Sequence, residues 1–111
     1  MEKITVKGEK FNVEESVTYS GQAVVSKTVV KSDSGTITLF AFDKGEGLSE
    51  YTAPFDAMVV LLNGVAEVII SGRANTLRAG EAIIMPADIP HALKATERFK
   101  MMLVMIKGSS H

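Results

Sequence analysis

The sequence has no cysteine, no tryptophan and no excess of charge of one sign, and it contains only three prolines. Without cysteine, disulfides, thiolate metal ligands and cysteine nucleophiles are excluded, so any metal ion would need histidine or carboxylate ligands. The net charge of −1 does not favour nucleic-acid binding. No apolar run approaches the roughly 20 residues of a membrane-spanning helix, and residues 1–10 lack the apolar core of a signal peptide. We therefore expect a cytoplasmic protein that binds neither nucleic acid nor membranes.

The 111 residues are enough for one domain, and their pattern indicates an all-β domain. Short segments rich in Val, Ile, Thr and Phe alternate with Gly, Asp, Asn or Pro, as strands alternate with tight turns. Hairpin turns are expected at Ser34-Gly35, Asn63-Gly64 and Ser71-Gly72. The expected strands are residues 23–31, 36–43, 48–53, 57–63, 66–71, 74–79, 81–86, 91–96 and 99–107. We assign residues 21–107 to a barrel, residues 1–20 to an extended or irregular N-terminal arm or strand, and residues 108–111 to a flexible tail.

Two of the expected strands are apolar on both faces. Residues 58–62 read Met-Val-Val-Leu-Leu, and residues 101–106 read Met-Met-Leu-Val-Met-Ile. A strand of this kind is covered on both sides, and in a domain of this size a partner subunit is a serious candidate for the outer cover. We therefore expect a homodimer, in which residues 1–20 are a candidate for exchange between subunits.

Glycine, proline and histidine recur at characteristic spacings in two segments. The first segment holds Gly45, Tyr51, Ala53, Ala57 and Gly64. The second holds Gly80, Pro86 and His91. Together these spacings resemble the two motifs of the cupin family, and the likeness extends over about residues 30–106. The resemblance implies a single-domain cupin, which is a double-stranded β-helix or jelly-roll barrel.

In that family the two motifs supply two histidines, a glutamate and a further histidine as ligands of a metal inside the barrel. By the resemblance these positions hold Tyr51, Ala53, Ala57 and His91 here, and His91 alone is retained. Alanine offers no lone pair and a neutral phenol is a poor ligand, whereas a stable site ordinarily needs about three protein ligands. We therefore expect no metal and no other cofactor. Asp88 is open to two interpretations, either an accessory ligand or, as we prefer, a turn residue bonded to its own backbone.

Replacing two ligands by alanine should leave space with an apolar wall at the barrel mouth. Strand alternation and the family pattern place the residues around Tyr51 and one face of the last strand on the inner side. The predicted ligand-binding residues are Tyr51, Ala53, Phe55, Ala57, Val59, His91, Phe99, Met101 and Leu103. The Met and Phe side chains among them are equally consistent with ordinary core packing.

Tyr51 and His91 are the candidate polar anchors of a ligand and also the candidate catalytic residues. Together they would give one cavity a proton donor and a proton acceptor. Our first hypothesis is a metal-independent cupin that binds an unknown small molecule in an apolar pocket inside the barrel. Three alternatives stay open: a metal-free isomerase or epimerase that uses the same two residues, a dioxygenase-like metalloenzyme with non-standard ligands, and a purely structural dimer.

Overall fold

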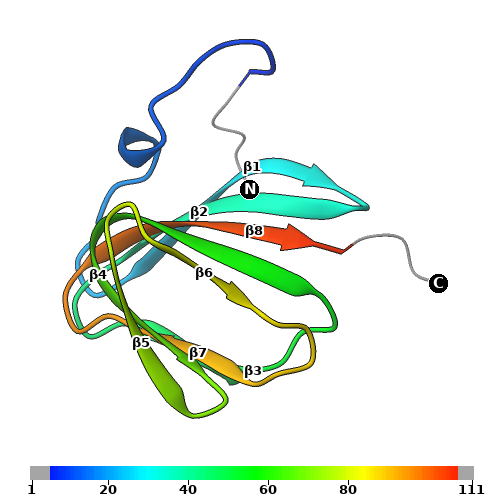
Figure 1. Cartoon of the computed structure of the whole chain (residues 1–111). Coiled ribbons are helices and arrows are strands. Elements are labelled where there is room, and N and C mark those ends of the chain that lie inside the picture. Colours follow the sequence, from blue (N-terminus) through cyan, green and yellow to red (C-terminus); the bar gives the residue numbers. More distant parts are fainter. Residues whose placement is uncertain (1–5, 108–111) are drawn as a thin grey trace.

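The strands follow one another largely as predicted, in a computed structural model that describes residues 6–107 (Figure 1). The elements are the 3-10 turn η1 (Glu14–Ser16) and the strands β1 (Val24–Ser32), β2 (Gly35–Phe42), β3 (Gly47–Tyr51), β4 (Asp56–Ile70), β5 (Arg73–Arg78), β6 (Ala82–Met85), β7 (His91–Lys94) and β8 (Phe99–Ile106). The all-β prediction is confirmed. Within the described range, no helix has the length and apolar character needed to cross a membrane. The predicted tail, residues 108–111, and residues 1–5 of the predicted arm lie outside the described residues.

The strands form two layers that share the long strand β4. The first layer runs β1-β2-β8-β4-β6 and the second runs β3-β7-β4-β5, with antiparallel neighbours throughout. The facing sides of the layers enclose an apolar core, in which the rings of Phe42 and Phe99 stack with centroids 4.5 Å apart. The architecture is consistent with the predicted jelly-roll barrel, because each layer buries one face against the other.

The Asn63-Gly64 dipeptide lies inside β4, so the predicted hairpin turn there is wrong. The pairing of β4 with β8 shifts by one residue between Leu61 and Asn63, which marks a β-bulge. Gly64 has a φ of 83°, and a Cβ at this position would overlap the carbonyl oxygen of Arg98. Glycine adopts a positive φ easily, which is why Asn-Gly is common in hairpin turns. The same positive φ is used here in a bulge, at the point where β4 passes from one layer to the other.

The turn predicted at Ser71-Gly72 is confirmed, and the turn predicted at Ser34-Gly35 lies one residue earlier. The first junction, between β1 and β2, is the two-residue turn Asp33-Ser34, with Ser32 opposite Gly35. The second joins β4 to β5, and it places Ile70 directly opposite Arg73. Because directly paired residues of an antiparallel pair point to the same face, the side chains of Ile70 and Arg73 leave the sheet on one side.

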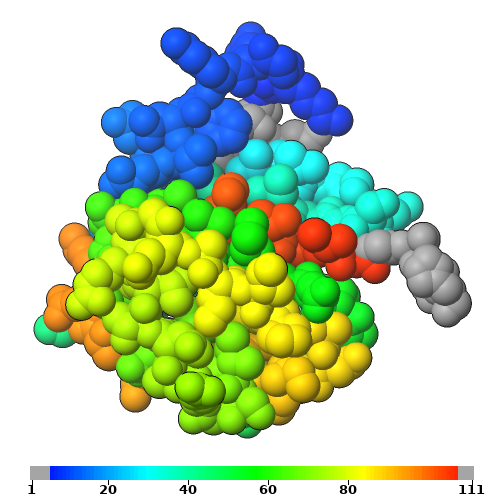
Figure 2. Space-filling view, in the orientation of Figure 1, coloured from blue at the N-terminus to red at the C-terminus, as the bar shows by residue number. Residues whose placement is uncertain are grey.

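Residues 13–19, which we call the strap, cover part of the outer side of the first layer. Val17 is fully buried with Leu39 and Ala41 of β2, and Val13 and Tyr19 pack beside them. Figure 2 shows the blue N-terminal segment, which includes the strap, lying against the strands. The strap packs on its own chain, and the exchange of residues 1–20 between subunits stays a prediction.

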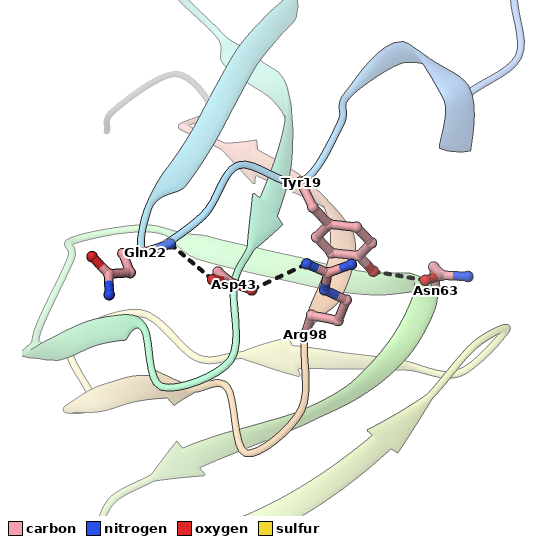
Figure 3. Close-up of polar contacts among 5 residues, drawn as sticks. All are labelled: Tyr19, Gln22, Asp43, Asn63 and Arg98. Atoms are coloured by element: carbon pink, nitrogen blue, oxygen red, sulfur yellow. Dashed lines mark hydrogen bonds and ion pairs between the residues drawn. The ribbon is translucent and has the colours of Figure 1, made fainter.

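A polar cluster, which we call the latch, fastens the strap to the barrel (Figure 3). The hydroxyl of Tyr19 donates to Oδ1 of Asn63 over 2.6 Å, and the guanidinium of Arg98 lies 4.4 Å from the centre of the Tyr19 ring. Arg98 also forms an ion pair with Asp43 at 3.3 Å. The other carboxylate oxygen of Asp43 accepts from the backbone amide of Gln22 at 2.8 Å. The latch thus connects the end of the strap to three separate parts of the barrel.

The remaining part of this outer side carries an apolar row that the described residues leave open. Directly paired residues of neighbouring strands form it: Val30, Ile37, Val104, Met58 and Ile84. Its two ends, Val30 and Ile84, are 42% and 61% exposed. Met58 and Val104 of this row belong to residues 58–62 and 101–106, the two segments that are apolar on both faces. The predicted homodimer would cover it and stays a prediction.

Candidate functional site

One end of the barrel, which we call the mouth, brings the two motif segments together. Two rows of directly paired residues lie at this end, one in each layer. The row in the first layer is Thr36, Met105, Ala57 and Met85. The row in the second layer is Tyr51, His91, Ile70 and Arg73. Residues 52–55 and 86–90 connect the two rows, so both rows lie at the same end of the barrel.

His91 is 2% exposed at the start of β7, and one hydrogen bond fixes its ring. Nδ1 lies 3.0 Å from the carbonyl oxygen of Ile89. A carbonyl oxygen only accepts, so Nδ1 carries a proton, and the tautomer with its single proton on Nδ1 has a lone pair on Nε2. Nε2 has no hydrogen bond to residues 6–107. Every fully buried side-chain nitrogen or oxygen in that range does have a hydrogen-bond partner, so Nε2 is not fully buried. It follows that Nε2 lies where water or a ligand can reach it.

Tyr51 lies beside His91 because β3 contains a bulge. Leu48 pairs with Leu93 and Tyr51 pairs with His91, so β3 has one additional residue between these two pairs. The ring centroids of Tyr51 and His91 are 4.3 Å apart at an interplanar angle of 72°, which is an edge-to-face contact. Burial raises the pKa of Tyr51 above the ordinary 10.0, so the phenol is protonated at neutral pH. The mouth therefore presents a hydroxyl donor next to an imidazole acceptor.

Positive φ angles account for the glycines of the two motif segments. Gly45, Gly64 and Gly80 have φ angles of 91°, 83° and 91°. Asp88 stands where the second motif of the resembled family has another glycine, and its φ is 64°, a conformation that aspartate tolerates better than most residues. Its backbone amide donates to the carbonyl of Ala53 over 2.7 Å, which ties the two loops of the mouth together. These contacts favour the turn interpretation of Asp88.

The comparison with protein families agrees with this geometry. The model described as "Cupin domain" matches residues 38–107, which is more than half of the chain. The chain belongs to the cupin family. The comparison with curated proteins finds no match.

Solved structures extend this result over nearly the whole chain. The cupin is 35% identical to a conserved protein of unknown function from Streptococcus pyogenes, with a TM-score of 0.89 and coverage of 99% of this chain and 98% of that one. It is 39% identical to a cupin 2 conserved barrel domain protein from Leptotrichia buccalis, with a TM-score of 0.85, over 87% of this chain but 47% of the other. A cupin superfamily protein from Desulfitobacterium hafniense is 25% identical, with a TM-score of 0.87 and coverage of 94% and 95%. These likenesses establish the family and the fold.

The four positions at which the family's metal is expected do not form a ligand set in this cupin. Ala53 and Ala57 offer only methyl groups, and the protonated phenol of Tyr51 is a poor ligand. His91 contributes one imidazole. Among residues 6–107, no three His, Asp or Glu side chains are grouped so that they could hold a metal ion. The donors present here therefore do not fit the family's metal.

The predicted ligand-binding residues of the cupin divide by depth. Val59, Phe99 and Met101 are 0% exposed, so no space the size of a water molecule adjoins them. They are core residues in this structure. Strand alternation predicts which face a side chain lies on, but it does not predict how deep in the barrel that side chain lies. Leu103 is 6% exposed and pairs directly with Val59, so it lies at the same level as this group. The others lie nearer the mouth: Tyr51, Ala53, Phe55, Ala57 and His91. A ligand would thus meet the mouth and not the filled interior.

A hollow on the side of the barrel lies between β5 and β6, away from the mouth. Asn75, Thr76, Leu77, Glu81, Ala82 and Ile83 line it. Two of its three polar side chains already bond to neighbouring backbone: the amide of Asn75 donates to the carbonyls of Val68 and Arg73, and Glu81 accepts from the amide of Arg78. We therefore place the candidate site at the mouth.

Sequence reasoning missed Arg73, the residue at the end of the second row. The signal that could have found it is the Ser71-Gly72 turn. A two-residue hairpin turn pairs the residues on its two sides, which are Ile70 and Arg73.

Proposed function

We propose that this cupin binds a small organic molecule at the barrel mouth without a metal ion, with Tyr51 and His91 as its polar anchors. The contact between the two rings, at 4.3 Å, supports this proposal. The Ile89 carbonyl holds the imidazole with Nδ1 occupied, so Nε2 is oriented in advance for a polar group of a ligand, and the phenol ring of Tyr51 lies beside it. Phe55, in the loop after Tyr51, and Met105, in the row of the first layer, are both partly exposed at this end of the barrel and offer apolar contact.

The same two residues could instead move a proton in a metal-free isomerase or epimerase. Such an enzyme needs a base for one proton transfer and an acid for the other, with pKa values suited to each. The eight residues of the two mouth rows include no carboxylate, and the pKa of Tyr51 is raised away from neutrality. These features favour binding over catalysis.

Histidine NMR tests the proposal directly, because the chain has two histidines, His91 and His111. In ¹⁵N-labelled protein we expect the tautomer of His91 that carries its proton on Nδ1. One equivalent of Zn²⁺ or Ni²⁺ should leave the Nε2 resonance in place, since no set of ligands surrounds it. A stoichiometric shift of that resonance with either ion would overturn metal-independent binding.

Native mass spectrometry of protein purified without chelators provides the second test. A bound organic molecule should be released by His91→Gln and retained by His111→Gln, the matched control. Retention of the molecule by His91→Gln would remove His91 from the site.

We also propose that a second copy of the chain covers the apolar row from Val30 to Ile84. A two-fold axis lets one row serve as its own partner, as in most homodimers. Ile84→Lys should convert a dimer into a monomer at micromolar concentration in sedimentation velocity. Arg78→Lys, at an exposed position outside the row, should remain dimeric. A monomeric wild-type chain would contradict the proposal.

A further inference from the structure

A cationic side chain at the end of the second mouth row indicates which class of molecule the mouth binds. Ile70 pairs with His91 on one side and with Arg73 on the other. The side chain of Ile70 packs against the core, so the row faces inward, and Arg73 lies on that same face. Arg73 is exposed, and its guanidinium has no hydrogen bond or ion pair to residues 6–107. The row therefore ends in an unpartnered guanidinium.

The opposite end of the row carries the polar anchors, and the middle is apolar. Neighbouring strands lie about 4.8 Å apart, so the backbones of Arg73 and His91, two strands apart, are separated by roughly 10 Å. Ile70 lies between them and offers a branched apolar side chain. A guanidinium binds a carboxylate through two parallel hydrogen bonds, which neither an amide nor a hydroxyl of a ligand matches in strength.

We propose that the ligand is a small organic acid. Its carboxylate pairs with Arg73, its apolar body lies over Ile70, and a hydroxyl or similar polar group bonds to Tyr51 and His91. This inference rests on the proposed function, because it names the class of molecule that the same anchors hold.

Two probes of equal length separate the contribution of the carboxylate from that of the anchors. The first is 4-hydroxybenzoate, which carries a carboxylate and a hydroxyl at opposite ends of a rigid apolar ring. The second is 4-hydroxybenzyl alcohol, which keeps the hydroxyl and the ring but has no charge. Each is titrated into the full chain, and the Nε2 resonance of His91 reports binding.

Arg73→Gln is the test variant, and Arg78→Gln is its matched control. Both arginines lie exposed on β5, but Arg78 is an odd number of residues away and points to the other face of the sheet. We expect Arg73→Gln to weaken 4-hydroxybenzoate binding at least fivefold and to leave 4-hydroxybenzyl alcohol unchanged. Arg78→Gln should change neither.

The outcomes distinguish this inference from the proposed function. If 4-hydroxybenzoate shifts His91 equally in wild type and Arg73→Gln, the role of Arg73 is overturned while the anchors stand. Equal weakening by Arg73→Gln and Arg78→Gln would indicate only a general effect of charge, and would likewise overturn that role. If neither probe shifts His91 in the wild-type chain, both the organic-acid inference and the anchoring role of His91 are overturned.

Discussion

The two tyrosines of the chain lie at opposite ends of the barrel and differ in how their hydroxyl groups are used. Tyr19 donates to Asn63 over 2.6 Å and lies under the guanidinium of Arg98. Tyr51 contacts the ring of His91, but its hydroxyl has no hydrogen bond to residues 6–107. Burial raises the pKa of both phenols. The hydroxyl of Tyr19 is thus partnered within the chain, and the hydroxyl of Tyr51 has no partner among residues 6–107.

This difference separates the structural role of Tyr19 from the binding role that we propose for Tyr51. A hydrogen bond completed inside the protein contributes to the free energy of folding, typically about 1 kcal/mol. A donor left open at a mouth contributes little to folding and is available to a ligand. The latch and the mouth should therefore respond differently to matched substitutions.

The largest effect is expected at Gly64, where the bulge positions Asn63 for the latch. Gly64→Ala would place a Cβ against the Arg98 carbonyl at a φ of 83°. We expect a loss of about 3 kcal/mol or more in the free energy of unfolding, because backbone strain and overlap add. Urea denaturation followed by circular dichroism measures the change.

Gly72→Ala is the control for this prediction. Gly72 has a similar φ of 79°, but no atom lies within 4 Å of the position that a Cβ would occupy there. The substitution should cost only the conformational strain, roughly 1–2 kcal/mol. Equal losses for the two variants would show that the bulge makes no special demand on Gly64.

The next largest effect is expected when the hydroxyl oxygen is removed from one tyrosine or the other. Tyr19→Phe should lower the free energy of unfolding by about 1 kcal/mol, because Asn63 loses its donor. Tyr51→Phe should change it by less than about 0.5 kcal/mol, because no intramolecular hydrogen bond is lost. Both values come from urea denaturation at neutral pH. If Tyr51→Phe destabilises the chain as much as Tyr19→Phe, the contrast between latch and mouth is wrong.

Alkaline titration sharpens the same contrast. Absorbance at 295 nm reports only the two tyrosines, as the chain has no tryptophan. Since burial raises both pKa values above 10.0, the folded state holds these protons more tightly than the unfolded state does. Stability should thus be intact below pH 10 and should fall as the pH rises through the folded pKa values. In Tyr19→Phe the remaining signal belongs to Tyr51, and a midpoint at 10.0 in that variant would contradict its burial.

Much of the fold and part of the site could be predicted from the sequence. The alternation of apolar segments and turn residues indicated the order of strands, and the motif spacing correctly brought Tyr51 and His91 together. Asn63-Gly64 misled because a positive φ serves a bulge as well as a turn. The latch could not be predicted, since Tyr19 and Asn63 are 44 residues apart and no local pattern links them.

The depth of the pocket was the other feature that could not be predicted from the sequence. Alternation placed Val59 and Met101 on the inner face, which is where they lie. Whether an inner side chain touches a cavity or another side chain depends on the packing of all the strands together, and both are 0% exposed. Local sequence carries no direct signal of that packing.

The smallest effect concerns Asp43, the acidic member of the latch. The backbone amides of Gln22 and Lys44, and then Arg98, hold the pKa of this carboxyl below the ordinary 3.8. Because the folded state binds this proton less tightly than the unfolded state, the ionised carboxylate favours folding at neutral pH, and this contribution declines as the pH falls below 3.8. Asp43→Asn should therefore be slightly less stable than wild type at pH 7, with the difference shrinking toward acid pH in urea denaturation. Asp33→Asn, at an exposed turn outside the latch, provides the comparison. A difference for Asp43→Asn that stays constant from pH 7 to pH 2 would mean that the charge of Asp43 does not hold the latch.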